Sequence, residues 1–468
     1  MHLPRGSNLI ILVIALLALI IPVILLEQSL LHHTDGHIVF PLDNAFVDIT
    51  VGRNLAFYQV WGVSKYAFQS ASSSLLYPVA LAPIFFLIGQ HLIIPILING
   101  LAAIFFLTSL QQALIRRHIR PAGQLGILLL IVFLTPLPLL VVSGTSYTLQ
   151  LLFSLLFLES LAVAIRHNKA RLPRPIYPPP PHQGISPLPR SVYLYGILMI
   201  AARYEDAILL LLACLLLLAL RRPAQAAKLA LISLSPVAVF GAISKLKGSN
   251  FLPNSLFLGP YSPYTIGLLL LSLLAGALLI AQYGRLATAQ KPVNPYHLTL
   301  TLMTLAALPF ITRNITVLRH FQEDSVRIYQ QEYPLAAFVH RYYRRANVGV
   351  NDIGAVAFFS DGRKLDFTGI ASADVARHRS DHSWNPQWAD SLSRKNNINT
   401  VMVSDPWFSI EQFPRWGKVA SWRLPDSEHS KGRTYSFYVT NQRDTSWILR
   451  CLRDYQQALP PSVEVRYY

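Results

Sequence analysis

Polar stretches between long apolar runs hold the residues best suited to chemistry in the part of the sequence before Arg313. Charged groups beside a membrane are costly, so they are candidates for function. A carboxylate can take the proton of an attacking hydroxyl, and Arg or Lys can hold a phosphate. The acids in these stretches are Glu27, Asp35, Asp43, Asp48, Glu205 and Asp206, and the cations singled out are Arg53, Arg203, Lys245 and Lys247. This combination is typical of a base paired with a phosphate leaving group.

Asp43 is the strongest candidate for the base. An ordinary Asp pKa near 4 keeps the carboxylate ionised at pH 7, and partial burial would raise the pKa towards a useful value. The alternative is that Asp43 only caps the helix expected to begin there. Asp48 follows five residues later, on a different face of that helix. We expect Asp48 to be structural or to position an acceptor.

The four cations have competing interpretations. Arg53 and Arg203 suit a donor phosphate, but Arg203 precedes Glu205 by two residues and is equally suited to a structural ion pair. Lys245 and Lys247 are candidates for the same phosphate, although anchoring at the membrane interface is the more common role of such lysines. The sequence therefore predicts donor binding by these cations without choosing among them.

Other enzyme classes lack their usual motifs. The sequence has no P-loop, paired CxxC, HExxH or GxSxG arrangement, so ATP hydrolysis and zinc proteolysis have no support. His32, His33, Asp35 and His37 are close in sequence, but their spacing matches no standard metal site. We predict no metal-binding residues and no required cofactor; a divalent metal is possible but unsupported.

The composition identifies the elements that must position these residues. Of 468 residues, 53% are hydrophobic and 13% charged, against about 25% charged in soluble domains. The net charge of +17 could indicate nucleic acid. However, the basic residues cluster between apolar runs, as the positive-inside rule produces, so nucleic acid is not expected as a partner. These features predict a multi-pass protein of the bacterial inner membrane, in contact with membrane lipids.

Nine apolar runs approach spanning length. They are Leu9–Leu26, Leu92–Gln111, Gly126–Val142, Thr148–Ile165, Val192–Ala202, Ala207–Leu220, Leu229–Ser244, Thr265–Gln282 and Tyr296–Ile311. If Leu75–Gly89 is an interfacial helix, the basic clusters at Arg116, Arg166–Arg174 and Arg221 all lie inside the cell. We therefore predict about nine transmembrane helices plus this interfacial helix. Ten spans is the alternative.

Sixteen of the 23 acids fall after Arg313, which predicts a water-soluble C-terminal domain. The expected organisation is a transmembrane domain over residues 1–313, with a large first outer loop at 27–74, and an extracytoplasmic α/β domain over 314–468. In the tail, Arg319–Arg345 has a helical pattern. Ala346–Phe359, Asn399–Ser404, Lys418–Leu424 and Thr434–Thr440 have the pattern of strands.

Five segments, in order, resemble a known family. They are Pro41–Asp48 with Gly52–Ala56 and Ser72–Pro78; Ser143–Leu149; Ala202–Glu205; Phe251–Ser255, which contains Asn254; and Val350–Ala355, which contains Asp352, with Leu365, Asp366 and Gly369. This pattern resembles the GT-C superfamily of membrane glycosyltransferases, in particular the bacterial group that includes mycobacterial arabinofuranosyltransferases. The likeness extends over residues 40 to about 370. Asn44, Ser146 and Tyr204 replace an Asp, a Glu and a Pro of the family pattern.

The resemblance implies a GT-C-like bundle and an inverting glycosyltransferase that uses a polyprenyl-phosphate sugar. The acceptor would be extracytoplasmic: a cell-wall glycan, a lipid-linked saccharide or a protein. On this reading Asp43 is catalytic, Arg53, Arg203, Lys245 and Lys247 bind the donor, and Asp48, Glu205, Asn254 and Asp352 contact the acceptor or are structural. One alternative is a transporter or flippase of lipid-linked sugars; another is an inactive glycan-binding subunit.

Overall fold

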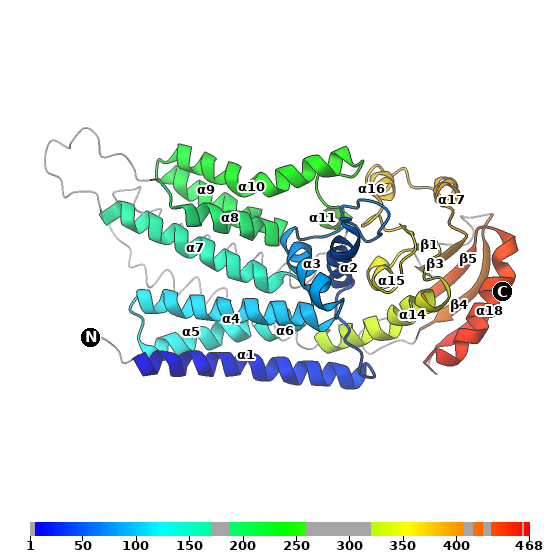
Figure 1. Ribbon diagram of the computed structural model, residues 1–468, viewed down its shortest axis with the longest axis horizontal. Helices are drawn as coiled ribbons and strands as arrows, with labels where there is room; N and C mark the ends of the chain where they lie inside the picture. Colours follow the sequence, from blue (N-terminus) through cyan, green and yellow to red (C-terminus); the bar gives the residue numbers. More distant parts are fainter. Residues whose placement is uncertain (1–4, 171–186, 259–319, 406–414, 425–431, 461–462) are drawn as a thin grey trace.

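The computed structural model describes residues 5–170, 187–258, 320–405, 415–424, 432–460 and 463–468. The predicted runs Thr265–Gln282 and Tyr296–Ile311, and residues 171–174 of the basic stretch Arg166–Arg174, lie outside the described residues. Within them, a helical bundle forms one end of an elongated molecule and a mixed α/β domain forms the other (Figure 1).

Helices α1 and α4–α10 form the bundle and run along its long axis (Figure 1). Their bounds are α1 Arg5–His33, α4 Ile93–Arg116, α5 Pro121–Leu134, α6 Leu137–Val142, α7 Tyr147–Ala170, α8 Arg190–Ala202, α9 Ala207–Ala219 and α10 Pro223–Leu246. Four helical segments are long and apolar enough to cross a membrane: Gly6–His33, Ile93–Arg116, Tyr147–Arg166 and Pro223–Leu246. Leu9, Phe105 and Leu231 are exposed on the bundle surface, as expected of side chains that face lipid.

The run Gly126–Val142, predicted as one span, is not one continuous helix. The run is divided into α5 and α6 by Thr135 and Pro136. Proline cannot donate a main-chain hydrogen bond, and its ring clashes with the preceding helical turn, so it ends α5. The Pro136 carbonyl then accepts hydrogen bonds from Leu139 and Leu140 as α6 begins.

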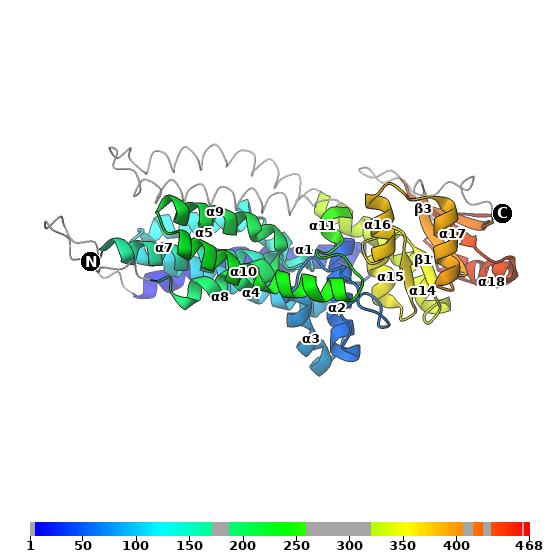
Figure 2. The same ribbon diagram turned by 90° about the horizontal axis from the view of Figure 1, so that it is seen from above.

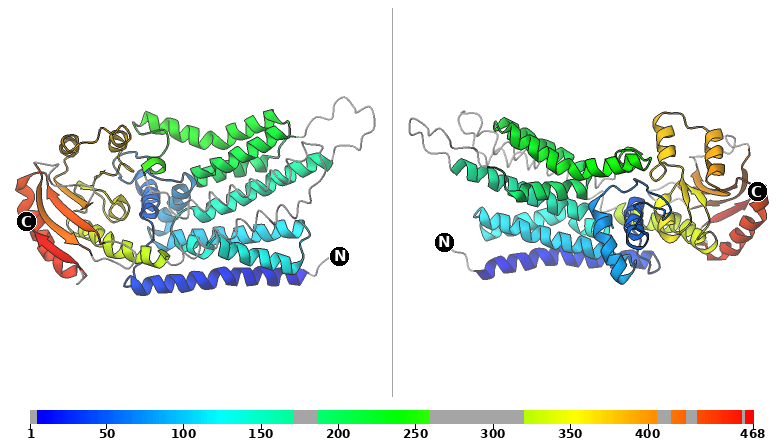
Figure 3. Two further views of the ribbon diagram at one scale, coloured as in Figure 1. Left: turned by 180° about the vertical axis from the view of Figure 1, so that it is seen from behind. Right: turned by 45° about the horizontal axis from the view of Figure 1, so that its top comes forward.

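The turns of the bundle lie at two ends. The α4–α5 and α9–α10 turns lie at the end that carries the N-terminus, whereas the α6–α7 and α8–α9 turns lie next to the C-terminal domain (Figures 1 and 3). At the α4–α5 turn, Arg117 forms an ion pair with Glu159 of α7, and the Arg116 guanidinium lies 3.7 Å from the same carboxylate. Basic residues 116–117 and 221–222 thus share one end of the bundle, as the charge pattern predicts.

Two further helices, α2 (Asp43–Tyr58) and α3 (Leu76–Ile88), lie where the bundle meets the C-terminal domain. Helix α3 projects sideways from the bundle (Figure 2). Its last turn exposes Phe86, Leu87 and Ile88, which suits a helix at the membrane interface. A Cβ at Gly52 of α2 would lie 3.0 Å from the Leu81 Cβ, so glycine permits close packing of the two helices.

The C-terminal domain has a six-stranded mixed sheet in the order β2-β1-β3-β5-β4-β6. Strand β1 is parallel to β2 and β3, whereas the β3–β5, β5–β4 and β4–β6 pairs are antiparallel. The strands are β1 Val348–Val350, β2 Lys364–Asp366, β3 Thr400–Asp405, β4 Gly417–Arg423, β5 Thr434–Val439 and β6 Glu464–Tyr467. The predicted strands near residues 400, 418 and 434 are confirmed.

Helices cover both faces of this sheet. On one face, Phe338 of α14 (Tyr333–Tyr342) packs against Trp422, Phe437 and Tyr455. That face also carries α15 (Ile353–Phe359) and α18 (Thr445–Tyr455), and the other face carries α16 (Ala373–Ser380) and α17 (Pro386–Lys395). Alternate residues of β3 and β5 enter the two cores, because side chains alternate along a strand.

The predicted strand over Ala346–Phe359 is correct only at its start. Val348–Val350 form β1, and Ile353–Phe359 form helix α15. The apolar and aromatic residues of this segment suit a buried strand as well as a buried helix. Side chains of α2 bind the main chain at both ends of α15, as described below, and these contacts favour the helix.

The fold predicts that the two ends of the bundle lie on opposite sides of the membrane. Arg120 lies in the α4–α5 turn and Gln457 follows α18, and both are exposed. In membrane vesicles, a maleimide that cannot cross the membrane should label Arg120→Cys and Gln457→Cys from opposite sides. The unmodified protein is the control, because Cys451 is buried and Cys214 lies within α9. Labelling of both variants from the same side would contradict this arrangement.

Candidate active site

Asp43 is the first residue of α2, but its carboxylate binds another helix. Oδ2 accepts a hydrogen bond of 3.0 Å from the Gly354 amide, and Oδ1 accepts one of 3.0 Å from the Ala355 amide. These amides belong to the first turn of α15, where no side-chain cap is provided by Asp352. The N-cap of α2 is Leu42. Asp43 therefore supplies the missing acceptor at α15, at the positive end of its helix dipole.

Further charged groups surround Asp43. Asp352 Oδ2 accepts hydrogen bonds from the Tyr435 hydroxyl at 2.7 Å and from Arg433 Nη1 at 3.3 Å. Glu332 lies 3.6 Å from the same Arg433 nitrogen. Burial, followed by the negative charge of Asp352, raises the pKa of Asp43 to about 6, although the two amide hydrogen bonds oppose the change. A carboxylate with this pKa accepts protons more readily than an ordinary Asp and remains mostly ionised at neutral pH.

Arg53 binds the opposite end of α15. Its Nη1 donates to the Phe358 carbonyl and its Nη2 to the Ala357 carbonyl at 3.3 Å, while Nε and Nη2 also donate to Asn54 Oδ1. The last carbonyls of a helix lack intrahelical partners and carry partial negative charge, so a cation there is favourable. Arg53 is 5% exposed. Its predicted contact with a donor phosphate stays a prediction, whereas its contact with α15 is direct.

Asp48 lies within the buried part of α2. Its Oδ1 accepts a hydrogen bond of 2.6 Å from Ser72 Oγ, and among the described residues its Oδ2 has no hydrogen-bond partner. Burial raises the pKa of Asp48 to about 6. Asp48 is 1% exposed, whereas Asp43 is partly exposed. Asp43 is therefore the more exposed of the two residues.

Arg203 and Glu205 form a buried ion pair in the turn between α8 and α9. Arg203 Nη2 and Nε donate to the two carboxylate oxygens of Glu205, at 2.7 and 3.2 Å. Nη1 donates to Ser73 Oγ at 3.1 Å, and the guanidinium lies over the Tyr147 ring, 4.6 Å from its centroid. Because Ser72 binds Asp48 and Ser73 binds Arg203, two adjacent serines join α2 to this ion pair.

The remaining predicted residues are separated. Lys245 and Lys247 are exposed at the C-terminal end of α10. Asn254 is buried, and its Nδ2 donates to the Gly369 carbonyl of the C-terminal domain at 2.9 Å. Asp352 belongs to the cluster around Asp43. The structure therefore brings Asp352 to Asp43, and Arg203 to Glu205, but it does not place the lysines in either group.

Sequence reasoning missed Glu332, Arg433 and Tyr435. These residues lie more than 280 positions from Asp43 and carry no motif, so no spacing pattern could have found them. Their position is fixed by the sheet and by α14. Ser146, which replaces a Glu of the family pattern, donates to the Ala202 carbonyl beside Arg203.

The histidine-rich loop also has structural contacts. Tyr329 donates to Asp35 Oδ2 at 2.9 Å, and Gln322 contacts His33. The His37 ring stacks against the Tyr329 ring, with centroids 5.9 Å apart. In the part of the chain that the structure describes, no three His, Cys, Asp or Glu side chains are placed to hold a metal ion.

An apolar groove of about 400 Å³ lies between α3, α8 and α10, near the end of the bundle that faces the C-terminal domain. Its lining includes Trp61, Leu75, Val79, Pro236, Val239 and Phe240. The Leu75 amide and Ser74 Oγ both donate to the Ala201 carbonyl. Leu75 of the groove thus lies two residues from Ser73 and is hydrogen-bonded to Ala201, two residues before Arg203.

The fold defines a helical membrane protein with an α/β C-terminal domain. Residues 321–438 match a family model described as a domain of unknown function (DUF8728). The matched segment contains Glu332, Asp352, α15 and Arg433, which form the C-terminal half of the Asp43 cluster. No curated protein and no solved structure matches the chain.

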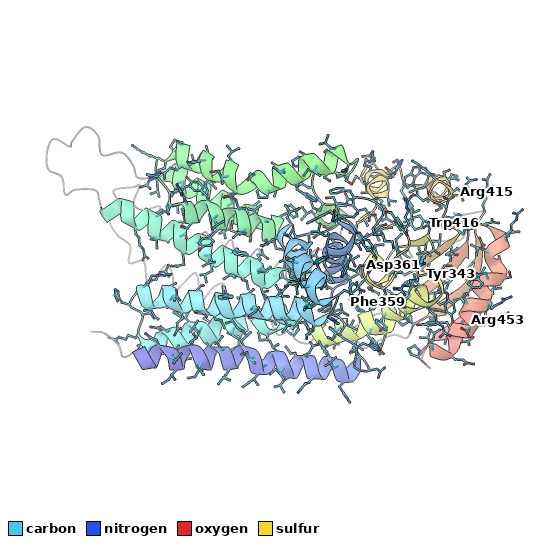
Figure 4. The ribbon with its side chains drawn as sticks, viewed as in Figure 1. Tyr343, Phe359, Asp361, Arg415, Trp416 and Arg453 are labelled. Carbon is cyan, nitrogen blue, oxygen red and sulfur yellow. The ribbon has the colours of Figure 1, made fainter. Side chains whose placement is uncertain are left out.

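Figure 4 shows which side of the C-terminal domain meets the bundle. Phe359 and Asp361, at the end of α15, lie towards α2, whereas Arg415, Trp416 and Arg453 lie on the side away from the bundle. The contacts of Asp43 and Arg53 are therefore made at the junction of the two domains.

The contacts of Arg53 predict a measurable loss of stability on its removal. Arg53→Gln leaves the carbonyls of Ala357 and Phe358 without their charged donor, and such hydrogen bonds contribute about 1.5–3 kcal/mol. We expect the free energy of unfolding of the C-terminal domain to fall by about this amount in denaturant titration. Arg377→Gln is the matched control: its ion pair with Asp374 is exposed, so its loss should cost about 0–1 kcal/mol. Equal effects of the two substitutions would contradict the role of Arg53.

Proposed function

We propose that this chain is an inverting glycosyltransferase that moves a sugar from a polyprenyl-phosphate carrier to an extracytoplasmic acceptor. One observation carries the proposal. Two segments that resemble the GT-C family, the first outer loop and the start of the C-terminal domain, are about 310 residues apart in sequence, yet they meet at Asp43. The meeting point holds a partly exposed carboxylate with a raised pKa.

In the proposed reaction, Asp43 accepts the proton of an acceptor hydroxyl group. The hydroxyl oxygen attacks the anomeric carbon of the sugar, the bond from that carbon to the phosphate oxygen breaks, and polyprenyl phosphate leaves. Each Asp43 oxygen accepts one amide hydrogen bond and retains capacity for a proton, because a carboxylate has about four acceptor sites.

The lipid carrier is supported by the groove beside Leu75. Its lining is apolar and its position is near the end of the bundle, as an isoprenoid chain requires. Arg203, two residues from Ala201, whose carbonyl accepts the hydrogen bond of the groove residue Leu75, would contact the phosphate, with Lys245 and Lys247 as further candidates. Because nucleotide sugars are cytoplasmic, a site on the outer side requires a lipid-linked donor. The proposal places the C-terminal domain outside the cell and the bundle in the bacterial inner membrane.

The proposed base is tested with two aspartates of the same helix. Asp43→Asn retains one oxygen acceptor for α15 but cannot take the proton, so kcat should fall by about 10²-fold or more. Asp48→Asn is the matched control, since Asn can still accept the Ser72 hydrogen bond; its kcat should fall far less. The assay follows sugar transfer by the purified protein from a panel of polyprenyl-phosphate sugars to glycan acceptors. A wild-type rate in Asp43→Asn, with a large loss in Asp48→Asn, would move the base to Asp48.

Donor binding is tested at Arg203. Arg203→Ala removes a cation from the outer end of the bundle, so the KM for the lipid-linked donor should rise by about tenfold or more while kcat falls less. The variant also leaves Glu205 unpaired, which costs stability. Arg120→Ala, at an exposed position in the α4–α5 turn at the other end of the bundle, is the control. If Arg203→Ala keeps the wild-type KM after its folded fraction is measured, Arg203 is only structural. If the purified wild-type protein moves the lipid-linked sugars between leaflets without transferring the sugar, the chain is a transporter.

A further inference from the structure

The contact between Asp43 and α15 depends on a glycine. A Cβ added at Gly354 would lie 2.1 Å from Asp43 Oδ1 and 2.3 Å from the Asp43 carbonyl oxygen. Both distances are far shorter than any real contact, so no other residue permits this approach without displacing Asp43. Gly354 has no positive φ to explain it. The glycine is thus required by the neighbouring carboxylate rather than by the backbone of its own helix.

The two amides of α15 fix the carboxylate in one orientation. Gly354 binds Oδ2 and Ala355 binds Oδ1, so rotation of the carboxylate would break both hydrogen bonds. The charged and titratable groups that face Asp43 are Asp352 and Glu332, with Arg433 and Tyr435 bound to Asp352. All of them belong to the C-terminal domain. The surroundings of Asp43 are therefore largely built by that domain.

We propose that the main-chain amides of Gly354 and Ala355 are positioning groups for Asp43, so that the C-terminal domain completes the catalytic centre rather than being only an attached binding module. This inference rests on the proposed function, in which Asp43 is the base. The amides do not touch the substrate. They hold the carboxylate where the acceptor hydroxyl meets it, and they stabilise its charged form.

The amide hydrogen bonds should also affect the pH dependence. Hydrogen bonds to a carboxylate favour its ionised form and lower its pKa. Their loss would raise the pKa of Asp43. A base works only when ionised, so the acid limb of the pH–rate profile would move to higher pH. A residue with a purely structural role would reduce the rate at all pH values alike.

The experiment compares three variants of the full-length protein. Gly354→Ala displaces the Asp43 carboxylate through the added methyl group. Ala355→Pro removes one amide donor without adding bulk at Gly354, and proline is tolerated in the first turn of a helix. Gly417→Ala is the matched control in the same domain, because its Cβ would lie at an ordinary 3.4 Å from Val439.

We expect the acid limb of kcat/KM to move by about one pH unit to higher pH in Gly354→Ala and Ala355→Pro. The fall in kcat should reach about tenfold near pH 6 and shrink at higher pH, with little change in the donor KM. Gly417→Ala should behave as wild type. The Asp43 carboxylate can also be followed without turnover, as the infrared carboxylate band that Asp43→Asn removes. Its titration should move in the same direction.

The outcomes separate this inference from the proposed function. If Asp43→Asn transfers sugar at the wild-type rate, the proposed base is wrong. If Asp43→Asn is inactive while both α15 variants keep the wild-type pH profile and infrared titration, the positioning role is wrong. Loss of folding in both variants, or a loss of rate that is equal at every pH, would also overturn it and leave Gly354 as a packing residue.

Discussion

The contact between α2 and α15 is the constraint on which the rest of the structure depends. Asp43 binds the amides at the start of α15, and Arg53 binds the carbonyls at its end. A negative charge at the N-terminus of a helix and a positive charge at its C-terminus both complement the helix dipole. A seven-residue helix is too short to be stable alone, so α15 depends on its contacts with α2 and with α14. Through α15, the first outer loop determines where the C-terminal domain lies.

At the end of the bundle next to the C-terminal domain, charged side chains are buried in a largely apolar chain. Arg203 donates to Glu205 and Ser73, and one oxygen of Asp48 accepts from Ser72. Buried charges are stable only when they are paired and hydrogen-bonded. Asp43 differs, because it is partly exposed and two of its partners are main-chain amides. A carboxylate held by two amides keeps its orientation, which suits proton transfer.

The sequence was informative about features with a strong local pattern. Apolar runs predicted helices of the bundle, the late acids predicted a separate C-terminal domain, and alternating residues predicted β3, β4 and β5. The break at Pro136 and the helix at Ile353–Phe359 were missed. The first was hidden by the continuous apolar run on both sides of it. The second follows from contacts with Asp43 and Arg53, which are about 300 residues away and leave no local signal.

Individual residues of the candidate site could be predicted from the sequence, but most of their contacts could not. Asp43 and Asp352 were singled out separately, and the structure brings them together, but the connection between them required the fold. Arg53 was singled out for its charge, while the carbonyls it binds could not be read from the sequence. Glu332 and Arg433 could not be predicted as site residues, because their partners lie in elements that are distant in sequence.

The polar contacts between the two domains also affect how the protein can tolerate mutation. Gln69 and Asn254 donate to the carbonyls of Ala371 and Gly369, and Asp43 and Arg53 likewise bind main-chain atoms. These four side chains belong to the bundle half, and all of them recognise the backbone of the C-terminal domain. Substitutions at positions 357 and 371 leave the bonded carbonyls in place, whereas a change at any of the four polar residues removes a contact. Sequence drift at this junction should therefore be freer at positions 357 and 371 of the C-terminal domain than at the four polar residues of the bundle half.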